Sequence, residues 1–527
     1  MQIKRLCVND HLCLVDFEIN FNTINGGSST ILIGENGTGK STMLETILEI
    51  LMSFDSPSIE KNIDYDYTIE YEYAQKKISI RKVGHSYQIT IDDRVVEGSY
   101  QKINVLLAGN TIFPKRIITF YSGAKNKIQR KITKTNWQYN KLCRKTIRHF
   151  LRVMNDDSER FIPNLPKRKY NYCDEKLTPI YLASILCGNE TFEKEYLIEA
   201  CNFNKVEFID MSIDMDSVEK IFGRPQFEGD VPTSLYYLTD FIDHRFTDLL
   251  RRGFMYSHDG TSYFEIKGLE KIEADSISIL EFFEKLSSLF DAQYEVTVSY
   301  DGIPVRCNDM SEGQRQLIKI LGMLGICKTE DCIVLMDEPD AHMNPKWKYE
   351  IEQTIAKSLQ NAVNTQAIIA THDPLVINGV SKEFIRIFTR NKVIMGNNKI
   401  LSFTKVITPT EDTEGMGIDG LLQSEYYGLA SVLDSETKKK MDKKHALLVK
   451  KKYGTVTDEE TQELLKLTMD LENMSFARNI PTDIYYDEYV AAMHKIYSER
   501  PKADLTAEDI AERNAKAEEI LRGLLGK

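Results

Sequence analysis

An apolar run that leads directly into a glycine-rich octapeptide constrains this chain more than any other feature. Thr30–Ile33 has the composition of a short buried strand, and Gly34–Ser41 reads GENGTGKS. Apolar residues then recur at helical spacing from Met43 to Leu51. A strand, a glycine-rich turn and a helix in this order form a phosphate-binding loop, whose glycines turn backbone N–H groups toward phosphates. The sequence therefore predicts an α/β core built around a nucleotide.

The positions of this loop have distinct expected roles. Lys40 is expected to reach the β- and γ-phosphates, Ser41 to ligate Mg²⁺, and Thr42 to make a further phosphate contact. The other predicted nucleotide-binding residues of the loop are Gly34, Asn36, Gly37, Thr38 and Gly39. ATP and Mg²⁺ are the predicted cofactors.

A second apolar strand ends in two carboxylates. Ile333–Met336 is followed directly by Asp337 and Glu338. A buried parallel strand delivers such residues to its carboxyl edge, where ligands bind in open α/β sheets. We expect Asp337 to hold Mg²⁺ through water and Glu338 to polarise the attacking water. The alternative is a solvated Asp-Glu turn before a helix.

Two more motifs could complete a nucleotide site. Met310–Gln316 reads MSEGQRQ and precedes an apolar helix. Ser311 and Gln314 have the spacing of a capping box, but a helix N-terminus that carries Ser311 and Gly313 could also hold a γ-phosphate. His372 follows an apolar strand and is expected to sense the γ-phosphate rather than to pack in the core.

In this order, GENGTGKS, MSEGQRQ, IVLMDEP and ATHDP resemble the Walker A, signature, Walker B and switch-histidine motifs of ABC-type ATPases. The strand-rich start resembles the heads of the structural-maintenance-of-chromosomes and DNA-repair branch. DEPDAHMNP is similar to bacterial overcoming-lysogenization-defect-type and defence-associated ATPases. The resemblance covers about residues 1–55 and 305–405. It implies that two heads enclose two ATP molecules, so that Ser311, Gly313 and Gln314 of one head face the nucleotide at Lys40 of the other.

The same resemblance implies that Glu338 and His372 are the catalytic residues and that Ser41 and Asp337 hold the metal. Two departures stand out. Glu312 occupies a place where the commonest signature has glycine, and no clear glutamine follows the strand that ends at Tyr121.

The predicted fold class is an α/β, ABC-type P-loop head with a mixed sheet, an antiparallel β subdomain, a helical insertion and a helical C-terminal extension. Strict alternation of apolar residues from Tyr65 to Val96 predicts the antiparallel meander. The predicted domains are residues 1–123 (first part of the head), 124–292 (mostly helical insertion), 293–410 (second part of the head) and 411–527 (helical extension). Helices are expected in the extension at Ser435–Tyr453, Asp458–Asn473, Asp483–Glu499 and Thr506–Leu525.

The charge of the chain is unevenly distributed. The net charge is −12, yet residues 98–155 contain no Asp or Glu and 13 Lys and Arg. Cations neutralise phosphates, and the aromatic Trp137 and Tyr139 could stack on bases. The basic segment Lys115–Arg152 is therefore a candidate for binding DNA or RNA. An acidic protein partner and a solvated helix face remain open alternatives.

No apolar run is long enough for a membrane span, and the N-terminus does not read as a signal peptide. Nine cysteines are scattered without a CxxC pair, which favours a cytoplasmic location and argues against zinc. The stretch Glu414–Leu422 and the charged helices after it resemble the extensions of Septu and retron-associated ATPases, which are encoded beside bacterial antiphage genes.

The predicted function is an ATP-hydrolysing homodimer, or a larger even-numbered oligomer, that regulates a separate effector in bacterial antiphage defence. The expected effector is a nuclease, and this chain shows no nuclease motif of its own. One alternative is an ATP-gated DNA clamp of the chromosome or repair type without a toxic effector. A transporter ATPase subunit is a second alternative.

Overall fold

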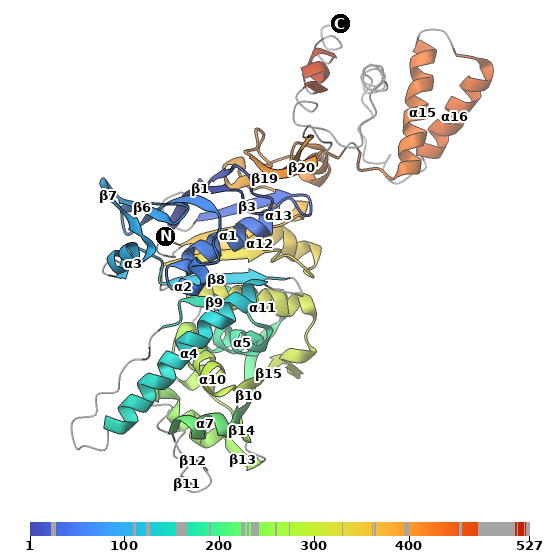
Figure 1. Ribbon diagram of the computed structural model, residues 1–527. Coiled ribbons are helices and arrows are strands. Elements are labelled where there is room, and N and C mark those ends of the chain that lie inside the picture. Colours follow the sequence, from blue (N-terminus) through green and yellow to red (C-terminus); the bar gives the residue numbers. More distant parts are fainter. Residues whose placement is uncertain are drawn as a thin grey trace. The chain divides into compact units, whose positions relative to one another are not determined.

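A seven-stranded sheet with a parallel centre organises the nucleotide motifs (Figure 1). Its strand order is β20-β19-β3-β18-β17-β8-β9. The strands are β3 (Ser28–Gly34), β8 (Arg116–Tyr121), β9 (Tyr170–Tyr172), β17 (Cys332–Asp337), β18 (Gln366–Ala370), β19 (Ile385–Ile394) and β20 (Ile400–Ile407). Neighbouring strands are parallel except that β20 pairs antiparallel with β19. Every residue of β17 and β18 is buried, as expected of strands that are covered on both faces.

The computed structural model describes residues 1–22, 28–108, 112–122, 127–153, 165, 167–188, 191–222, 227–228, 231–232, 242–258, 261–272, 274–328, 330–360, 362, 365–394, 400–429, 431–452, 456–472, 512–513, 515–520 and 522. The chain divides into two units. The first comprises Met1–Ile377 with Glu383–Thr408, and the second comprises Asn378–Lys382 with Pro409–Lys527. The four-part division expected from the sequence is finer and stays a prediction.

An antiparallel sheet of six strands adjoins the first motif in sequence, which confirms the predicted β subdomain. Its order is β2-β1-β4-β5-β6-β7. The strands are β1 (Gln2–Asn9), β2 (Phe17–Asn20), β4 (Asp66–Tyr73), β5 (Lys76–Val83), β6 (Ser86–Ile91) and β7 (Arg94–Ser99). Leu12 and Asp16 adopt positive φ in the segment between β1 and β2.

Helices cover the first unit's sheets and connect its strands. They are α1 (Lys40–Ser53), α2 (Pro57–Glu60), α3 (Tyr100–Ala108), α4 (Lys127–Val153), α5 (Thr178–Cys187), α6 (Phe192–Cys201), α7 (Met215–Phe222), α9 (Thr247–Gly253), α10 (Ser276–Phe290), α11 (Glu312–Ile326), α12 (Pro345–Leu359) and α13 (Pro374–Ile377). Of these, α1 packs against β3, β17 and β18 through Met43, Leu44, Ile47 and Leu48. The apolar spacing after the glycine-rich loop thus marks the face that the sheet buries.

The insertion predicted as mostly helical also carries strands. A five-stranded sheet has the order β13-β14-β10-β15-β16. Within the insertion, its strands are β10 (Phe203–Asp214), β13 (Phe254–His258) and β14 (Thr261–Ile266), and a separate short pair joins β11 (Phe227–Glu228) to β12 (Val231–Pro232). The sheet continues into β15 (Gln293–Tyr300) and β16 (Ile303–Arg306), which belong to the predicted second part of the head. Bulges interrupt the alternation of β10, and its partners β14 and β15 are distant in sequence. This explains why local periodicity did not reveal the sheet.

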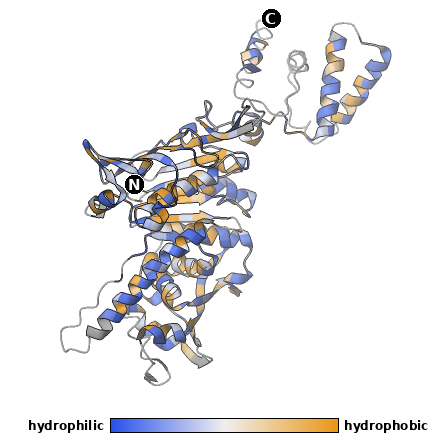
Figure 2. Ribbon diagram, in the orientation of Figure 1, coloured by the Kyte–Doolittle hydropathy of each residue, from blue (hydrophilic) through white to orange (hydrophobic). Residues whose placement is uncertain are grey.

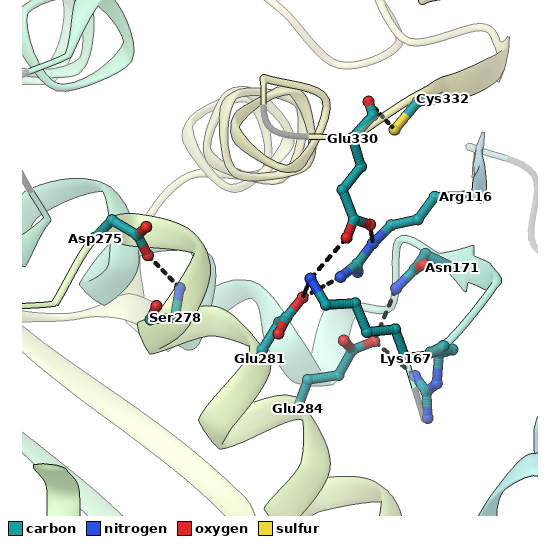
Figure 3. A network of polar contacts seen from close by, with 10 residues as sticks. Arg116, Lys167, Asn171, Asp275, Ser278, Glu281, Glu284, Glu330 and Cys332 are labelled. Atoms are coloured by element: carbon teal, nitrogen blue, oxygen red, sulfur yellow. Dashed lines mark hydrogen bonds and ion pairs between the residues drawn. The ribbon is translucent and has the colours of Figure 1, made fainter. Parts of the chain in front are cut away.

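A network of charged side chains fastens the insertion to the central sheet (Figure 3). Arg116 of β8 forms ion pairs with Glu281 of α10 and with Glu330, which precedes β17. Lys167 pairs with Glu330 at 2.6 Å. Asn171 of β9 donates to Glu284 of α10 at 3.1 Å. The network joins four segments that are distant in sequence near the amino end of β17.

The second unit contains α14 (Gly417–Gln423), α15 (Ser435–Lys452) and α16 (Asp458–Glu472). The last two pack together and are linked by the ion pairs Lys443–Glu463 and Lys450–Glu460. Both were predicted to within a residue. The expected helix Asp483–Glu499 lies outside the described residues, and of Thr506–Leu525 the structure describes residues 512–513, 515–520 and 522, which are helical.

No helix in the described parts of the chain has the length and apolarity that crossing a membrane requires.

Candidate nucleotide-binding site

The glycine-rich loop joins β3 to α1 and encloses the side chain of Lys40. Its Nζ donates to the carbonyl oxygens of Gly34 at 2.6 Å and Glu35 at 3.1 Å. Burial lowers the pKa of the Lys40 ammonium, while the nearby carboxylates of Asp337, Glu338 and Glu35 act in the opposite direction. The predicted phosphate-binding cation therefore lies beside the two predicted carboxylates.

Two glycines of the loop are required by close packing. A Cβ at Gly34, where φ is +142°, would lie 2.2 Å from the carbonyl oxygen of Phe388. A Cβ at Gly39, where φ is +101°, would lie 2.6 Å from Oγ1 of Thr404. A side chain at Gly34 would have to displace the backbone of β19, and one at Gly39 would have to displace the side chains of Thr404 and Cys13. The positive φ at both positions also favours glycine, so the loop conformation depends on these residues.

Residues that the sequence interpretation missed hold this loop from the other side. Arg390 of β19 donates from Nη2 to the carbonyl oxygen of Gly37 at 2.5 Å. Thr404 of β20 donates from Oγ1 to the carbonyl oxygen of Thr38 at 2.7 Å. These bonds engage carbonyl groups and leave the loop's N–H groups available for an anion. Nothing local in the sequence indicated them, because both donors lie more than 350 residues downstream.

The other predicted nucleotide-binding residues of the glycine-rich segment lie in the loop between β3 and α1 or in the first turn of α1, as expected. Thr38 is buried and donates from Oγ1 to the carbonyl oxygen of Glu35 at 2.8 Å. Asn36 is exposed in the loop, and Thr42 is half-buried in the first turn of α1. Their predicted contacts with the nucleotide stay predictions.

Asp337 and Ser41 supply oxygen atoms that suit a magnesium ion. Asp337 is 5% exposed at the end of β17. Burial raises the pKa of its carboxyl to about 6, a shift that the hydrogen bond from Ser41 opposes and the charge of Glu338 increases. A carboxylate and a hydroxyl beside a phosphate-binding loop are ligands that Mg²⁺ prefers. When bound, the ion would neutralise charge on the β- and γ-phosphate oxygens.

Glu338 and His372 meet because of strand register. Asp337 of β17 pairs with Ala370 of β18, so the residues that follow these two strands lie side by side. Nδ1 of His372 lies 3.1 Å from Oε1 of Glu338. Glu338 adopts a φ of +51°, a conformation that is costly for a side chain with a Cβ and is typical of functional sites. Both side chains remain open to solvent, where a water molecule and a phosphate could reach them.

The signature segment begins α11 and has the capping box that its spacing predicted. The backbone N–H of Gln314 donates to Oγ of Ser311 at 3.3 Å, and that of Ser311 donates to Oε1 of Gln314 at 3.0 Å. The segment also borders a hollow of about 470 Å³. Its lining includes Ser311, Gly313, Gln314, His342, Asn344 and Trp347.

Among the described residues, this hollow includes none from the glycine-rich loop, and neither Asp337, Glu338 nor His372. Within one copy of the chain, the signature segment and the glycine-rich loop therefore do not line this hollow together. His342 and Trp347 were not assigned a role from the sequence. His342 adopts a φ of +63°, and its Nδ1 lies 3.6 Å from Oε2 of Glu312.

The basic segment is divided between core and surface. Arg116 was counted with the candidate nucleic-acid contacts, but it is 1% exposed and pairs with Glu281 and Glu330. Its assignment to a binding surface was wrong, because a run of positive charge does not reveal which way each side chain points. Lys131 pairs with Glu49, whereas much of the rest of α4 is exposed.

Comparisons with known proteins find defence-associated ATPases among the relatives of this chain. Residues 216–378 match the family described as "AAA domain, putative AbiEii toxin, Type IV TA system". The Retron Vc95 probable ATPase of Vibrio cholerae is 22% identical over 83% of this chain and 82% of that protein. The Septu protein PtuA of Bacillus mycoides is 28% identical over 24% of this chain and 17% of that protein. The chain resembles ABC-type ATPases of the defence-associated kind.

This ATPase also aligns with a solved Smc head bound to the C-winged helix domain of ScpA. The alignment covers 78% of this chain and 98% of that one, with 13% identity and a TM-score of 0.34. A score of this size does not by itself establish a common fold. The assignment of the ATPase depends instead on its own motifs and on its relatives in sequence.

Proposed function

We propose that two copies of this ATPase close head to head around two ATP molecules. Each nucleotide would lie between the glycine-rich loop of one copy and Ser311, Gly313 and Gln314 of the other. The observation that carries this proposal is the separation of the two half-sites within one copy. A helix N-terminus that opens to a hollow away from its own phosphate loop is suited to an anion brought by a partner.

The arrangement fits hydrolysis of ATP to ADP and phosphate. Lys40 and the loop N–H groups hold the β- and γ-phosphates. Glu338 accepts a proton from the water whose oxygen attacks the γ-phosphorus, while the bond to the bridging oxygen of ADP breaks. His372 orients Glu338 through the 3.1 Å contact and lies where the γ-phosphate is expected. Loss of the γ-phosphate removes the contact that joins the two copies, so hydrolysis reopens the dimer.

In this proposal, closure and reopening regulate a separate effector, a nuclease, in cytoplasmic antiphage defence. The similarity to a retron ATPase along most of both chains supports this role. The sequence of the second unit contains none of the four nucleotide motifs, so this unit is available for a partner.

Mixing two inactive variants tests the shared site. Lys40→Ala removes the phosphate-binding cation, and Ser311→Arg blocks the far wall. Neither variant should hydrolyse ATP alone. An equal mixture should recover about a quarter of the wild-type rate, because half of randomly formed dimers are mixed and each has one intact site. Ser311→Thr is the control, since it keeps a hydroxyl that can cap α11. A mixture no more active than its parents would contradict the shared site.

The rival function is an ATP-gated DNA clamp that needs no effector, and the exposed basic helix α4 is the observation that favours it. Phage challenge of cells separates the two. Cells that express this chain without the protein encoded beside it should gain no protection if an effector is required. Protection by this chain alone would favour the clamp.

A further inference from the structure

One face of α4 presents a continuous cationic stripe. Its members are spaced by three or four residues and are Arg130, Lys134, Trp137, Lys141, Lys145 and Arg148. Residues at this spacing lie along one side of a helix. All six are exposed, whereas Ile128, Ile132, Cys143 and Ile147 on the other side are buried. Figure 2 shows mostly hydrophilic residues on the visible turns of this helix.

The charges of the stripe are not neutralised within the described parts of the protein. No carboxylate there pairs with Arg130, Lys134 or Lys145. Arg148 donates from Nη2 to the carbonyl oxygen of Lys220 at 2.8 Å, which orients its guanidinium but leaves its positive charge. The neighbouring Lys131 differs, because it turns toward Glu49 and pairs with it. In a protein of net charge −12, this stripe is a local site for a polyanion.

Trp137 lies in the middle of the stripe and is 61% exposed. The Nζ of Lys141 is 5.2 Å from the centroid of its ring, a cation–π contact that holds the indole at the surface. Trp137 borders two hollows. One, of about 390 Å³, includes Arg130 and Lys134, and the other, of about 500 Å³, includes Lys145 and Arg148. An aromatic face between two cation-lined hollows can stack on a base whose neighbouring phosphates contact the cations.

We propose that this stripe binds a single strand of nucleic acid. The spacing of Arg130 and Arg148 corresponds to about 27 Å along the helix, a length that spans about eight phosphates of a stacked strand. An unpaired strand is favoured over a duplex because Trp137 can reach a base face only where the base is not paired. This inference goes beyond the proposed dimer and does not depend on it.

Fluorescence anisotropy with labelled oligonucleotides tests the stripe in the full-length protein. The probes are single-stranded DNA, single-stranded RNA and duplex DNA of about 15 nucleotides, which exceeds the length of the stripe. The first variant combines Arg130→Gln, Lys134→Gln and Lys145→Gln. The matched control combines Lys61→Gln, Lys76→Gln and Lys77→Gln, which removes the same charge from exposed positions elsewhere in the first unit.

The wild type and the control should bind the single strands more tightly than the duplex. The triple variant of the stripe should reduce the slope of log affinity against log salt by about two, because each lost single-strand contact contributes about 0.7. Trp137→Ala should lower single-strand affinity by about 5- to 150-fold, with the same loss at high salt as at low salt. Basal ATP hydrolysis should stay near wild type in all variants. The DNA and RNA probes show which single strand is preferred.

Three results would overturn the proposal. They are the absence of single-strand binding by the wild type, equal salt slopes for the triple variant and its control, and preference for the duplex with no effect of Trp137→Ala. Co-purification of an acidic protein that only the triple variant loses, without any oligonucleotide binding, would assign the stripe to a protein partner instead.

Discussion

Acidic residues lie at both ends of β17, but their surroundings shift the pKa values of Glu330 and Asp337 in opposite directions. At the amino end, Glu330 accepts from Lys167 at 2.6 Å and from Arg116 at 2.5 Å. Burial alone would raise the pKa of Glu330, but these two hydrogen bonds outweigh it and lower the pKa. At the carboxyl end, burial raises the pKa of Asp337 to about 6 despite the hydrogen bond from Ser41. Glu338 beside it adopts a strained φ of +51°.

This difference separates a structural use of charge from a functional one. The amino end pairs its carboxylates within the chain and ties α10 to the sheet, so it stabilises the fold (Figure 3). At the carboxyl end, Asp337 is buried, and the chain itself does not fully compensate the charge of its carboxylate. Such groups are stabilised when a cation or a reacting water arrives, and perturbed carboxylates of this kind are typical of functional sites.

Replacing a glutamate by glutamine at each end of β17 tests this difference most directly. Glu338→Gln should lower single-turnover ATP hydrolysis by about 10²–10⁴-fold, because the amide keeps the shape of the side chain but cannot accept the proton. Glu330→Gln should leave hydrolysis near wild type and lower the stability by about 1–3 kcal/mol, because its partners lose a charged acceptor. Hydrolysis and chemical denaturation of both variants provide the check. An unchanged rate in Glu338→Gln would remove that residue from the role of base.

Arg116→Met should have the next largest effect, on stability alone. It leaves Glu281 and Glu330 with Lys167 as their remaining cation, and removal of one member of a buried network costs about 3–5 kcal/mol. Adding Glu281→Gln and Glu330→Gln should recover part of that loss, because the two negative charges that Arg116 balanced are removed as well. Denaturation midpoints of the single and triple variants measure this recovery. A triple variant less stable than Arg116→Met would contradict the compensation expected at this end.

The sequence predicted that Asp337 and Glu338 lie at the end of a buried strand, because the residues that determine this placement are neighbours in the chain. The apolar strand, Asp337 and Glu338 are contiguous, and so are the residues of the glycine-rich loop. The capping box of Ser311 and Gln314 was likewise readable from a spacing of three residues. Motifs of closely spaced residues can be recognised without knowledge of the tertiary structure.

The amino end was not predicted, because its partners come together only in the fold. Arg116 and Glu281 are 165 residues apart, and the charge of Arg116 was attributed to a surface. The supports of the phosphate loop, Arg390 and Thr404, are likewise non-local. The sheet around β10 was missed for the same reason, since strand pairing over long sequence distances leaves little local signal.

The smallest expected effect concerns the opposite pH dependence of the two ends. The pKa of Asp337 is raised from its ordinary value of 3.8 to about 6, so the folded protein holds this proton more tightly than the unfolded chain. Ionisation of Asp337 therefore lowers the free energy of unfolding as the pH rises from 3.8 to about 6, and this loss of stability persists above pH 6. Asp337→Asn, measured with a chelator and without nucleotide, should raise the free energy of unfolding by about 1–3 kcal/mol at pH 8 and by much less near pH 4.

For Glu330 the effect of pH on stability is reversed. Its pKa is lowered from the ordinary value of 4.5, so its ionised carboxylate stabilises the folded protein above about pH 4.5, and this stabilisation is lost as the pH falls. Glu330→Gln should therefore be destabilising at pH 8 and less so near pH 4, which makes it the matched control for Asp337→Asn. Denaturant unfolding of both variants at the two pH values measures the signs directly. If Asp337→Asn changed stability equally at both, its carboxyl would titrate as an ordinary surface group, and the contrast between the ends of β17 would be lost.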